Sequence, residues 1–405
     1  MKNNWPIKKL EEVCDVFADG DWIEKKDQSA NGIRLIQTGN IGNGHFLDRN
    51  KKARYISEST FKRLRCTEVL PGDCLLSRLP DPVGRAALIP DAKEKMITAV
   101  DCTIMRFKKD ILPKWFIYYS LSPEYQSEIN KAVTGATRQR ISRSNLGLVD
   151  IPAPPVSDQR RLISIFDGVF EKAAKAKENA QKNLQNAREL LESYLQNIFA
   201  NPGNDWERSN LEDHIKFIDY RGRTPEKTES GMRLITAKNV KNGYLQDEPR
   251  EYVHPSIYKT WMTRGIPKMG DVLFTTEAPL ANVAQLNTEE KVVFSQRIII
   301  FQPVPNKLDQ TFLKYLLLSK PIQERIHGKS TGATVKGIKA RWLKKIPIEF
   351  PALDQQCEIV KKLDLLSAET KKLEVIYQQK LSDLEELKKS VLHKAFNGEL
   401  AGVCS

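Results

Sequence analysis

The longest regular pattern in the chain is an apolar seam that alternates steps of four and three residues. Its first copy, within 158–200, consists of Leu162, Phe166, Val169, Ala173, Ala176, Ala180, Leu184, Ala187, Leu191, Tyr194 and Ile198. The second copy, about 197 residues later, consists of Ile359, Leu363, Leu366, Thr370, Leu373, Tyr377, Leu381, Leu384, Lys388, Val391 and Ala395. Such steps are typical of helices that pack along a heptad seam. Lysine, glutamate, glutamine and asparagine fill the positions between, so the pattern predicts two long helices.

The two predicted helices share an irregularity that favours packing against each other. Each seam has two steps of four in succession, around Ala180 in the first copy and around Tyr377 in the second. Packing of each helix on its own globular part is the alternative, but it gives no reason for the same irregularity in both copies. We therefore predict an antiparallel coiled coil, with each helix on the order of 60 Å long at ~1.5 Å per residue.

A globular segment precedes each predicted helix, and the two segments repeat one order of short motifs. Each begins with a tryptophan, then a strand, a polar loop, a Gly-Asp turn into a second strand, a third strand and an aromatic-rich helix. These motifs are Trp5, Ile33–Ile36, 37–44, Gly72-Asp73, 103–107 and 115–119 in the first segment, and Trp206, Met232–Ile235, 236–243, Gly270-Asp271, 297–301 and 312–316 in the second. We expect each segment to be α+β, with a strongly bent sheet, one or two helices and long polar loops.

Repeated motifs also mark where each globular segment ends. Thr-Gly-Ala-Thr occupies 134–137 and 331–334, a proline-rich boundary follows each copy, and Asp-Gln comes next at 158–159 and 354–355. A period this long exceeds the roughly 20–50 residues of a solenoid unit, so the repeat is a domain with its helix, and a pseudo-two-fold relation is expected. The predicted division is a first head at 1–156, a central helix at 157–200, a second head at 201–352, and a distal helix with a tail at 353–400.

The formal net charge of +13 is concentrated in the two heads. Residues 1–157 have 25 Lys and Arg against 19 Asp and Glu, and residues 201–353 have 24 against 17. The predicted helices are nearly neutral, with 7 basic against 6 acidic residues in 158–200 and 8 against 8 in 354–396. Two basic heads joined by neutral helices favour two contacts to one polyanion.

Side chains that can contact base edges and phosphates gather in the loops of both heads. The loops differ most after the Thr-Gly-Ala-Thr motifs, as expected if one scaffold recognises two different sequences. For any single residue, a solvated turn is the alternative. The candidate DNA-binding residues are Arg34, Gln37, Thr38, Asn40, Ser77, Arg78, Thr137, Arg138, Gln139, Arg140 and Arg143 in the first head, and Arg221, Arg223, Thr224, Lys238, Asn239, Thr275, Ser295, Gln296, Arg297, Thr334, Lys336, Lys339 and Arg341 in the second.

Catalytic and metal-binding motifs are missing from the sequence. Pro154-Pro155 lacks the flanking residues of an amino-methyltransferase motif, and Gln323 stands where a phosphate-binding loop ending at Ser330 needs glycine. Asp81 and Asp91-Ala92-Lys93 match a nuclease string only superficially, because Asp91 follows a proline in a predicted loop. The five histidines show no metal-ligand spacing. We therefore expect neither catalytic residues nor a metal site.

The cellular compartment is suggested by cysteine usage and by the apolar runs. The six cysteines form no CxxC pair, which argues against a zinc knuckle, and their low count argues against a secreted disulfide framework. The N-terminal residues lack the apolar core of a signal peptide, and no apolar run approaches membrane-spanning length. A cytoplasmic location is expected.

A second apolar stripe lies off the heptad seam near the end of each predicted helix. A stripe that the helix pair does not use is a candidate surface for a partner protein. Packing beneath the heads is the alternative. The stripe consists of Leu190, Leu195 and Phe199 in the first copy, and of Leu387, Leu392 and Phe396 in the second.

Together these features resemble the specificity (S) subunit of type I restriction–modification systems over essentially the whole chain. The resemblance rests on the doubled proline-rich boundary with Asp-Gln and a long helix, and on the Gly-x-Thr loop before each boundary. The closing Leu-Lys-Lys-Ser-Val-Leu-His-Lys-Ala-Phe-Asn-Gly-Glu-Leu at 387–400 is the most specific element. Asp158 and Asp354 depart from the family, which more often has glutamate before this glutamine.

The resemblance implies a non-catalytic subunit with two target recognition domains, each recognising half of a split DNA site, and helices that set the gap. It also implies that the helices bind two modification subunits, which hold S-adenosylmethionine and methylate adenine, and that a restriction subunit can join. No cofactor is expected in this chain. A self-contained nuclease or methyltransferase is the competing hypothesis, and the missing motifs speak against it. A purely structural coiled coil would leave the confined charge unexplained.

Overall fold

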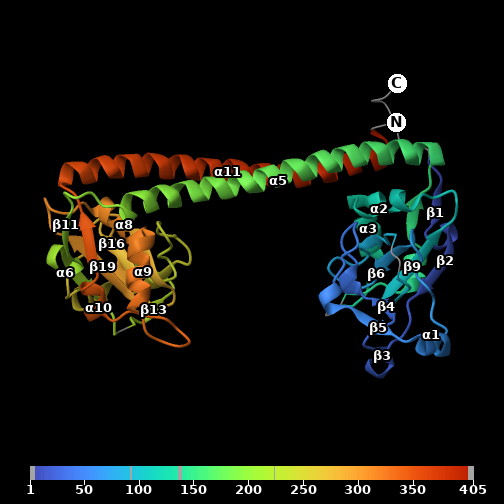
Figure 1. Cartoon of the computed structure of the whole chain (residues 1–405), viewed down its shortest axis with the longest axis horizontal. Coiled ribbons are helices and arrows are strands. Elements are labelled where there is room, and N and C mark those ends of the chain that lie inside the picture. The colour runs from blue at the N-terminus through green and yellow to red at the C-terminus, as the bar shows by residue number, and fades with distance from the viewer. Residues whose placement is uncertain (1–4, 92–93, 136–138, 223, 400–405) are drawn as a thin grey trace. The chain divides into compact units, whose positions relative to one another are not determined.

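The computed structural model describes residues 5–91, 94–135, 139–222 and 224–399 (Figure 1). The chain divides into two compact units, a first unit of residues 1–181 with 379–405 and a second unit of residues 182–378. Each unit therefore contains one head together with a part of both long helices. Among the described residues, no helix is long and apolar enough to cross a membrane.

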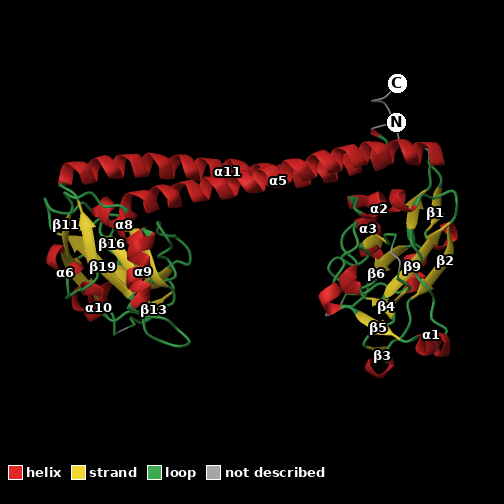
Figure 2. Ribbon diagram, viewed as in Figure 1, coloured by secondary structure: helices red, strands yellow, loops and turns green. Residues whose placement is uncertain are grey.

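Short strands and helices make up the first head (Figure 2). In chain order they are β1 (Ile7–Lys9), β2 (Cys14–Asp19), β3 (Gln28–Ser29), β4 (Ile33–Ile36), β5 (Arg54–Ile56), α1 (Glu58–Leu64), β6 (Cys74–Ser77), β7 (Ala86–Leu88), β8 (Met96–Thr98), β9 (Cys102–Phe107), α2 (Pro113–Ser120), α3 (Pro123–Ala132), α4 (Arg143–Gly147) and β10 (Asp150–Pro152), with 3-10 turns at Glu11–Val13, Lys25–Asp27, Thr38–Asn40 and Asn50–Lys52.

The second head repeats this order with small changes. Its elements are β11 (Glu207–Asn210), α6 (Leu211–His214), β12 (Ile215–Asp219), β13 (Lys227–Thr228), β14 (Met232–Ile235), β15 (Glu251–Val253), α7 (Tyr258–Trp261), β16 (Val272–Thr276), β17 (Leu280–Gln285), β18 (Val293–Phe294), β19 (Ile298–Pro303), α8 (Gln310–Leu318), α9 (Lys320–Gly328), α10 (Ala340–Lys344) and β20 (Pro347–Phe350), with a 3-10 turn at Pro255–Ile257.

Both heads have one sheet topology. The first head contains the sheets β2-β9-β6-β7, β3-β5-β4-β8 and β1-β10, and the second contains β12-β19-β16-β17, β13-β15-β14-β18 and β11-β20. The prediction of two matching α+β heads is confirmed. The single bent sheet that we expected in each head is instead divided into separate sheets. In the first head, the strand before the polar loop (β4) bonds to β5 and β8, whereas the strand after the Gly-Asp turn (β6) bonds to β7 and β9.

An aromatic-rich helix packs on one four-stranded sheet of each head, which we call the main sheet. It is β2-β9-β6-β7 in the first head and β12-β19-β16-β17 in the second. Trp115 and Phe116 of α2 are at most 1% exposed, and Phe312 of α8 is completely buried in the corresponding core. Burying one apolar side chain of this size contributes roughly 1.5–3 kcal/mol. The aromatic stretches at 115–119 and 312–316 thus lie on helices, and each contributes to the core that its head shares with the long helices.

The two long helices are α5 (Val156–Ala200), with 45 residues, and α11 (Leu353–Phe396), with 44 residues. The start of α5 lies one residue before the predicted start. Every residue of the predicted seam is buried or half-buried except Leu373, which is 37% exposed. The heptad interpretation is therefore confirmed along nearly its whole length.

Within each unit the two helices run antiparallel. In the first unit, the rings of Phe166 and Phe396 lie 6.0 Å apart and Lys177 Nζ lies 2.8 Å from Glu385. In the second unit, Arg188 Nε lies 2.8 Å from Glu374, and one apolar core contains both Phe199 and Leu363. Exposed ion pairs of this kind contribute at most about 1 kcal/mol, so the apolar seam stabilises the pairing.

A buried glutamine fastens the start of each long helix to its head. Gln159 accepts a hydrogen bond from the Leu112 N–H (2.8 Å) and donates to the Asp110 and Pro154 carbonyls (2.7 and 2.8 Å). Only an amide offers an acceptor together with two donors, which explains the glutamine of the repeated motif.

The equivalent glutamine in the second unit is Gln356. It accepts from the Asp309 N–H (2.8 Å) and donates to the Lys307 and Pro351 carbonyls (2.9 and 2.8 Å). Our alignment of Asp-Gln at 354–355 with 158–159 was therefore wrong by one residue. Gln355 is exposed and donates instead to Asp205 (3.2 Å).

The predicted partner stripe is largely part of the two cores, which corrects our assignment. Leu195 (8% exposed) and Phe199 (4%) lie in the core of the second unit, and Leu392 (1%) lies in the core of the first. Phe396 packs against the rings of Trp115 and Tyr119 at 4.9 and 5.0 Å. The heads need these side chains to complete their own cores, and only Leu190 and Leu387 stay exposed.

Candidate nucleic-acid interface

In the first head, three segments meet where β6 ends and β9 begins, and we call this region the first corner. The loop after α3 closes on itself, because Thr134 and Arg140 exchange two backbone hydrogen bonds of 2.9 Å. The Arg78 N–H donates to the Asp101 carbonyl (2.9 Å), and the Ile141 N–H donates to the Arg78 carbonyl (3.2 Å). The described ends of the loop that differs most between the heads thus lie at the end of the main sheet β2-β9-β6-β7.

The arginines of the first corner differ in exposure. Arg78 is 4% exposed, donates to the Val100 carbonyl (2.6 Å) and pairs with Asp19 (3.3 Å). Arg140 is exposed and pairs with Asp101 at 3.3 Å. Arg78 therefore stabilises the corner from inside, whereas Arg140 and Asp101 form its outer surface.

The equivalent region of the second head, where β16 ends and β19 begins, has the same backbone connections, and we call it the second corner. The Thr276 N–H donates to the Arg297 carbonyl (2.8 Å), and the Ile338 N–H donates to the Thr276 carbonyl (3.0 Å). Thr331 and Gly337 exchange two bonds of 2.9 Å, as Thr134 and Arg140 do in the first corner.

Charged side chains surround a cavity of about 360 Å³ in the second corner. Arg297 Nε lies 3.0 Å from Glu277, and Arg221 Nη2 lies 2.6 Å from Asp219. Burial acts to raise the pKa of Asp219, but hydrogen bonds from Arg221 outweigh it and hold the pKa below its usual value. Gln296 and Lys339 also line the cavity, so it offers both donors and acceptors to a ligand.

The shared backbone bonds show which residues occupy equivalent positions. Arg78 corresponds to Thr276, Asp101 to Arg297, and Arg140 to Gly337. The charge at the second of these positions is reversed between the heads, and the basic side chain at the third is absent from the second head. The two corners therefore have the same backbone hydrogen bonds but carry side chains of different charge.

Backbone strain accompanies the second corner. Arg297 (φ 81°) and the nearby Ala278 (φ 44°) and Ala281 (φ 67°) lie in the left-handed region, where a non-glycine residue costs on the order of 1–2 kcal/mol. In the described part of the first head, Arg65 at the end of α1 is the only such residue. Strain of this kind clusters at functional sites, which supports the second corner as a binding site.

The predicted DNA-binding residues that the structure describes fall into three groups by exposure. Exposed are Gln139, Arg140, Arg143, Thr224, Lys238, Gln296, Arg297, Thr334, Lys336, Lys339 and Arg341, and half-buried are Gln37, Thr38 and Arg221. Buried are Arg34, Asn40, Ser77, Arg78, Asn239, Thr275 and Ser295. Thr137, Arg138 and Arg223 lie outside the described residues.

The seven buried residues stabilise the heads, so we withdraw them as direct DNA contacts. Asn40 accepts from the Gln37 N–H (3.0 Å) and donates to the Leu47 carbonyl (2.9 Å), while Asn239 accepts from Thr236 and donates to Gln246. The hydroxyls are also engaged: Ser77 donates to Leu79, Thr275 accepts from the Asn282 N–H, and Ser295 donates to Gln296. Arg34 and Arg78 are held by carboxylates.

The acidic members of the corners were missed by sequence reasoning. Asp101, Asp219 and Glu277 each pair with an arginine of a corner. A search for basic and amide side chains passes over carboxylates, although a carboxylate can accept a hydrogen bond from the cytosine amino group. Their position opposite an arginine was not visible in the sequence.

Metal-ligating clusters and activated thiols are two features that a catalytic site could use. No group of three or more His, Cys, Asp or Glu side chains among them could hold a metal ion. Burial raises the pKa of Cys14 and Cys102 to about 12 and that of Cys66 to about 11. These thiols are therefore protonated at neutral pH, and a protonated thiol is a weak nucleophile.

A protein-family model and curated relatives match this chain. The family model of the type I restriction modification DNA specificity domain matches residues 2–185 and 203–381. The chain is 22% identical to the putative type I restriction enzyme MjaX specificity subunit of Methanocaldococcus jannaschii, with 99% of this chain and 94% of that protein covered. It is 20% identical to the type I restriction enzyme EcoKI specificity subunit of Escherichia coli, with 99% and 90% covered.

Solved structures show the same fold. A chain from a study of assembly and conformational transition in the type I R-M system matches with a TM-score of 0.79 at 18% identity, over 98% of both chains. The HsdS subunit from Thermoanaerobacter tengcongensis matches with a TM-score of 0.62 at 16% identity, over 98% of this chain and 97% of that one.

Proposed function

Because the chain belongs to the type I restriction–modification DNA specificity family, we propose that its two heads recognise two different halves of one DNA target. The chain is a specificity subunit with two target recognition domains. It recognises DNA sequence and is not itself an enzyme, since catalysis resides in partner subunits of the complex.

The observation that supports two unlike half-sites is the reversal of charge between the corners. Arginine donates to guanine and a carboxylate accepts from cytosine in the major groove. Asp101 and Arg297, which occupy equivalent positions, therefore favour different bases. The proposed contacts are the exposed and half-buried members of the predicted set, together with Asp101 and Glu277.

The chain acts in a complex with DNA and other subunits, and we propose two modification subunits as the core of that complex. Support for two copies comes from the repeat, which gives each unit an equivalent helix end with one exposed leucine, Leu190 or Leu387. In this proposal the modification subunits hold S-adenosylmethionine and methylate adenine, and restriction subunits join the full assembly. This chain needs no cofactor of its own.

Sequencing of modified DNA tests the proposed function directly. In a strain that expresses this chain with its modification subunits, we expect one methylated motif with two unlike halves around an unspecified gap. The matched control expresses the modification subunits without this chain and should lose that motif. A motif that persists in the control, or calorimetric binding of S-adenosylmethionine to the isolated chain, would contradict the proposal.

We further propose that α5 and α11 set the length of the gap. Removing seven residues around Ala180 and seven around Tyr377 deletes two turns from each helix and keeps the heptad seam in phase. The change shortens each helix by ~10 Å, so the gap should shorten by about three base pairs at 3.4 Å each. Methylated motifs of the two strains are compared, and altered half-sites with an unaltered gap would refute the spacer role.

A further inference from the structure

The first head contains a buried arginine that two carboxylates neutralise. Arg34 lies on β4 with a side chain that is 5% exposed, and it pairs with Asp48 and with Glu94 (2.7 Å). A buried charge requires such partners because its desolvation is costly. The guanidinium group of Arg34 is therefore already paired and buried, and it is not accessible to a ligand.

The second head has the same set of residues at equivalent positions. Arg34 pairs in register with Tyr55, and Arg233 pairs with Tyr252. Backbone bonds in the polar loops place Asp247 where the first head has Asp48. The parallel pairs β4–β8 and β14–β18 place Glu290 where the first head has Glu94.

One substitution changes the arrangement in the second head. Arg250 directly precedes β15, at the position that Ala53 occupies before β5. Arg250 and Arg233 both pair with Asp247, the latter at 2.9 Å. No ion pair among the described residues joins Arg233 to Glu290. The Glu290 carboxylate therefore does not neutralise Arg233 as the Glu94 carboxylate neutralises Arg34 in the first head.

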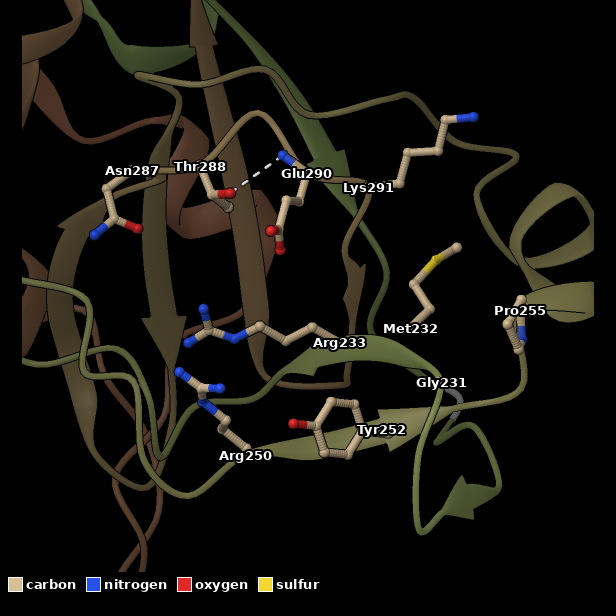
Figure 3. Close-up of a pocket in the computed structure, with 10 residues that line it drawn as sticks. All are labelled: Gly231, Met232, Arg233, Arg250, Tyr252, Pro255, Asn287, Thr288, Glu290 and Lys291. Atoms are coloured by element: carbon tan, nitrogen blue, oxygen red, sulfur yellow. Dashed lines mark hydrogen bonds between the residues drawn. The ribbon is translucent and has the colours of Figure 1, made fainter.

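The result is an open, basic cavity of about 670 Å³ (Figure 3). The guanidinium groups of Arg233 and Arg250 lie next to each other at one end, with Asn287 beyond them and the Tyr252 hydroxyl directed toward Arg250. Asp247 is shared between the two guanidinium groups, and Arg250 Nε also lies 3.8 Å from Glu248. Lys291 adds a third basic side chain to the lining, against the single lining carboxylate of Glu290. Each guanidinium has five N–H donors, more than these carboxylates engage, so donors remain for a ligand.

We propose that this cavity binds a phosphate of the DNA backbone, and that the paired Arg34 in the described part of the first head does not do so. Guanidinium groups donate pairs of hydrogen bonds to phosphate oxygens, and two adjacent arginines favour an anion between them. The inference rests on the proposed function, because it assigns the phosphate to the target DNA.

The test compares the salt dependence of duplex binding by the complex of this chain with its modification subunits. Arg250→Ala introduces alanine, the residue that the first head has at the equivalent position, Ala53. Because Arg250 is exposed, the variant should keep its fold, and thermal unfolding will verify this. Loss of one phosphate contact should flatten the slope of log K against log salt by ~0.9. Raising the salt concentration from 50 to 200 mM weakens DNA binding by both proteins. The factor by which it weakens binding by the variant should be roughly 3–4-fold smaller than the factor for wild type, on target and random duplexes alike.

The matched control is Arg54→Ala, which removes an exposed arginine from β5, the equivalent strand of the first head. Its slope should equal that of wild type. Equal flattening in both variants, or an unchanged slope in Arg250→Ala, would overturn the phosphate site. Calorimetric binding of inorganic phosphate that Arg250→Ala abolishes, with an unchanged DNA slope, would overturn the assignment to DNA. A wild-type complex that binds no duplex would instead refute the proposed function.

Discussion

Leu392→Ala is expected to lower the free energy of unfolding of the first unit by about 2–5 kcal/mol. Leu392 is 1% exposed and shares a core with Leu162 and Phe166 of α5 and with Trp115 of α2. Truncation removes buried apolar contacts and leaves a cavity that surrounding helices fill only in part. Urea unfolding followed by circular dichroism and tryptophan fluorescence measures the change.

Leu387→Ala is the matched control, because it makes the same substitution on the same helix at a side chain that is 47% exposed. Its effect on unfolding should stay within about 0.5 kcal/mol. Equal destabilisation by both variants would mean that Leu392 has no special place in the core. We therefore assign Leu392 and Leu195 to the cores and no longer to a partner contact. Polar substitutions at these two positions would damage the heads themselves.

Arg297→Ala is expected to weaken discrimination at one base pair of one half-site by about 1–3 kcal/mol and to leave the other half-site unchanged. Arg297 is exposed, borders the cavity of the second corner and is held by Glu277 at 3.0 Å. Removing its guanidinium takes away the donors that would contact guanine. Competition binding with single-base variants of the methylated motif measures the loss position by position.

Arg208→Ala provides the control in the same head, since Arg208 on β11 has a side chain that is 78% exposed. It should leave the pattern of base preferences unchanged. If both variants reduced affinity equally for target and random duplexes, Arg297 would contact phosphate rather than a base.

The helices and the order of strands were predictable because their signals are periodic or repeated. The seam from Leu162 to Ile198 fixes a helix regardless of what covers it, and a motif that appears twice supports the same element in both copies. The aromatic stretches at 115–119 and 312–316 gave the cores for a similar reason, since so many apolar residues on one short helix must be buried.

The DNA-binding and partner-binding residues were less predictable, because one residue type can either contact a ligand or stabilise the fold. Asn40 and Asn239 have the chemistry to contact adenine, yet each satisfies the backbone of its own loop. Arg34 is neutralised by Glu94, 60 residues away, and no local pattern reveals such a partner. The apolar stripe failed similarly, because Leu392 packs in a core with α2, far away in sequence.

The division of the chain into compact units also affects the order in which the protein can fold during synthesis. The second unit, residues 182–378, is continuous and contains every residue of its own core. The first unit needs Leu392 and Phe396 against Trp115, so its core stays incomplete until those residues leave the ribosome. At roughly 5–20 residues per second, the first-made head waits on the order of 10–40 s with an aromatic surface uncovered. The head that is synthesised first is thus the last to be finished.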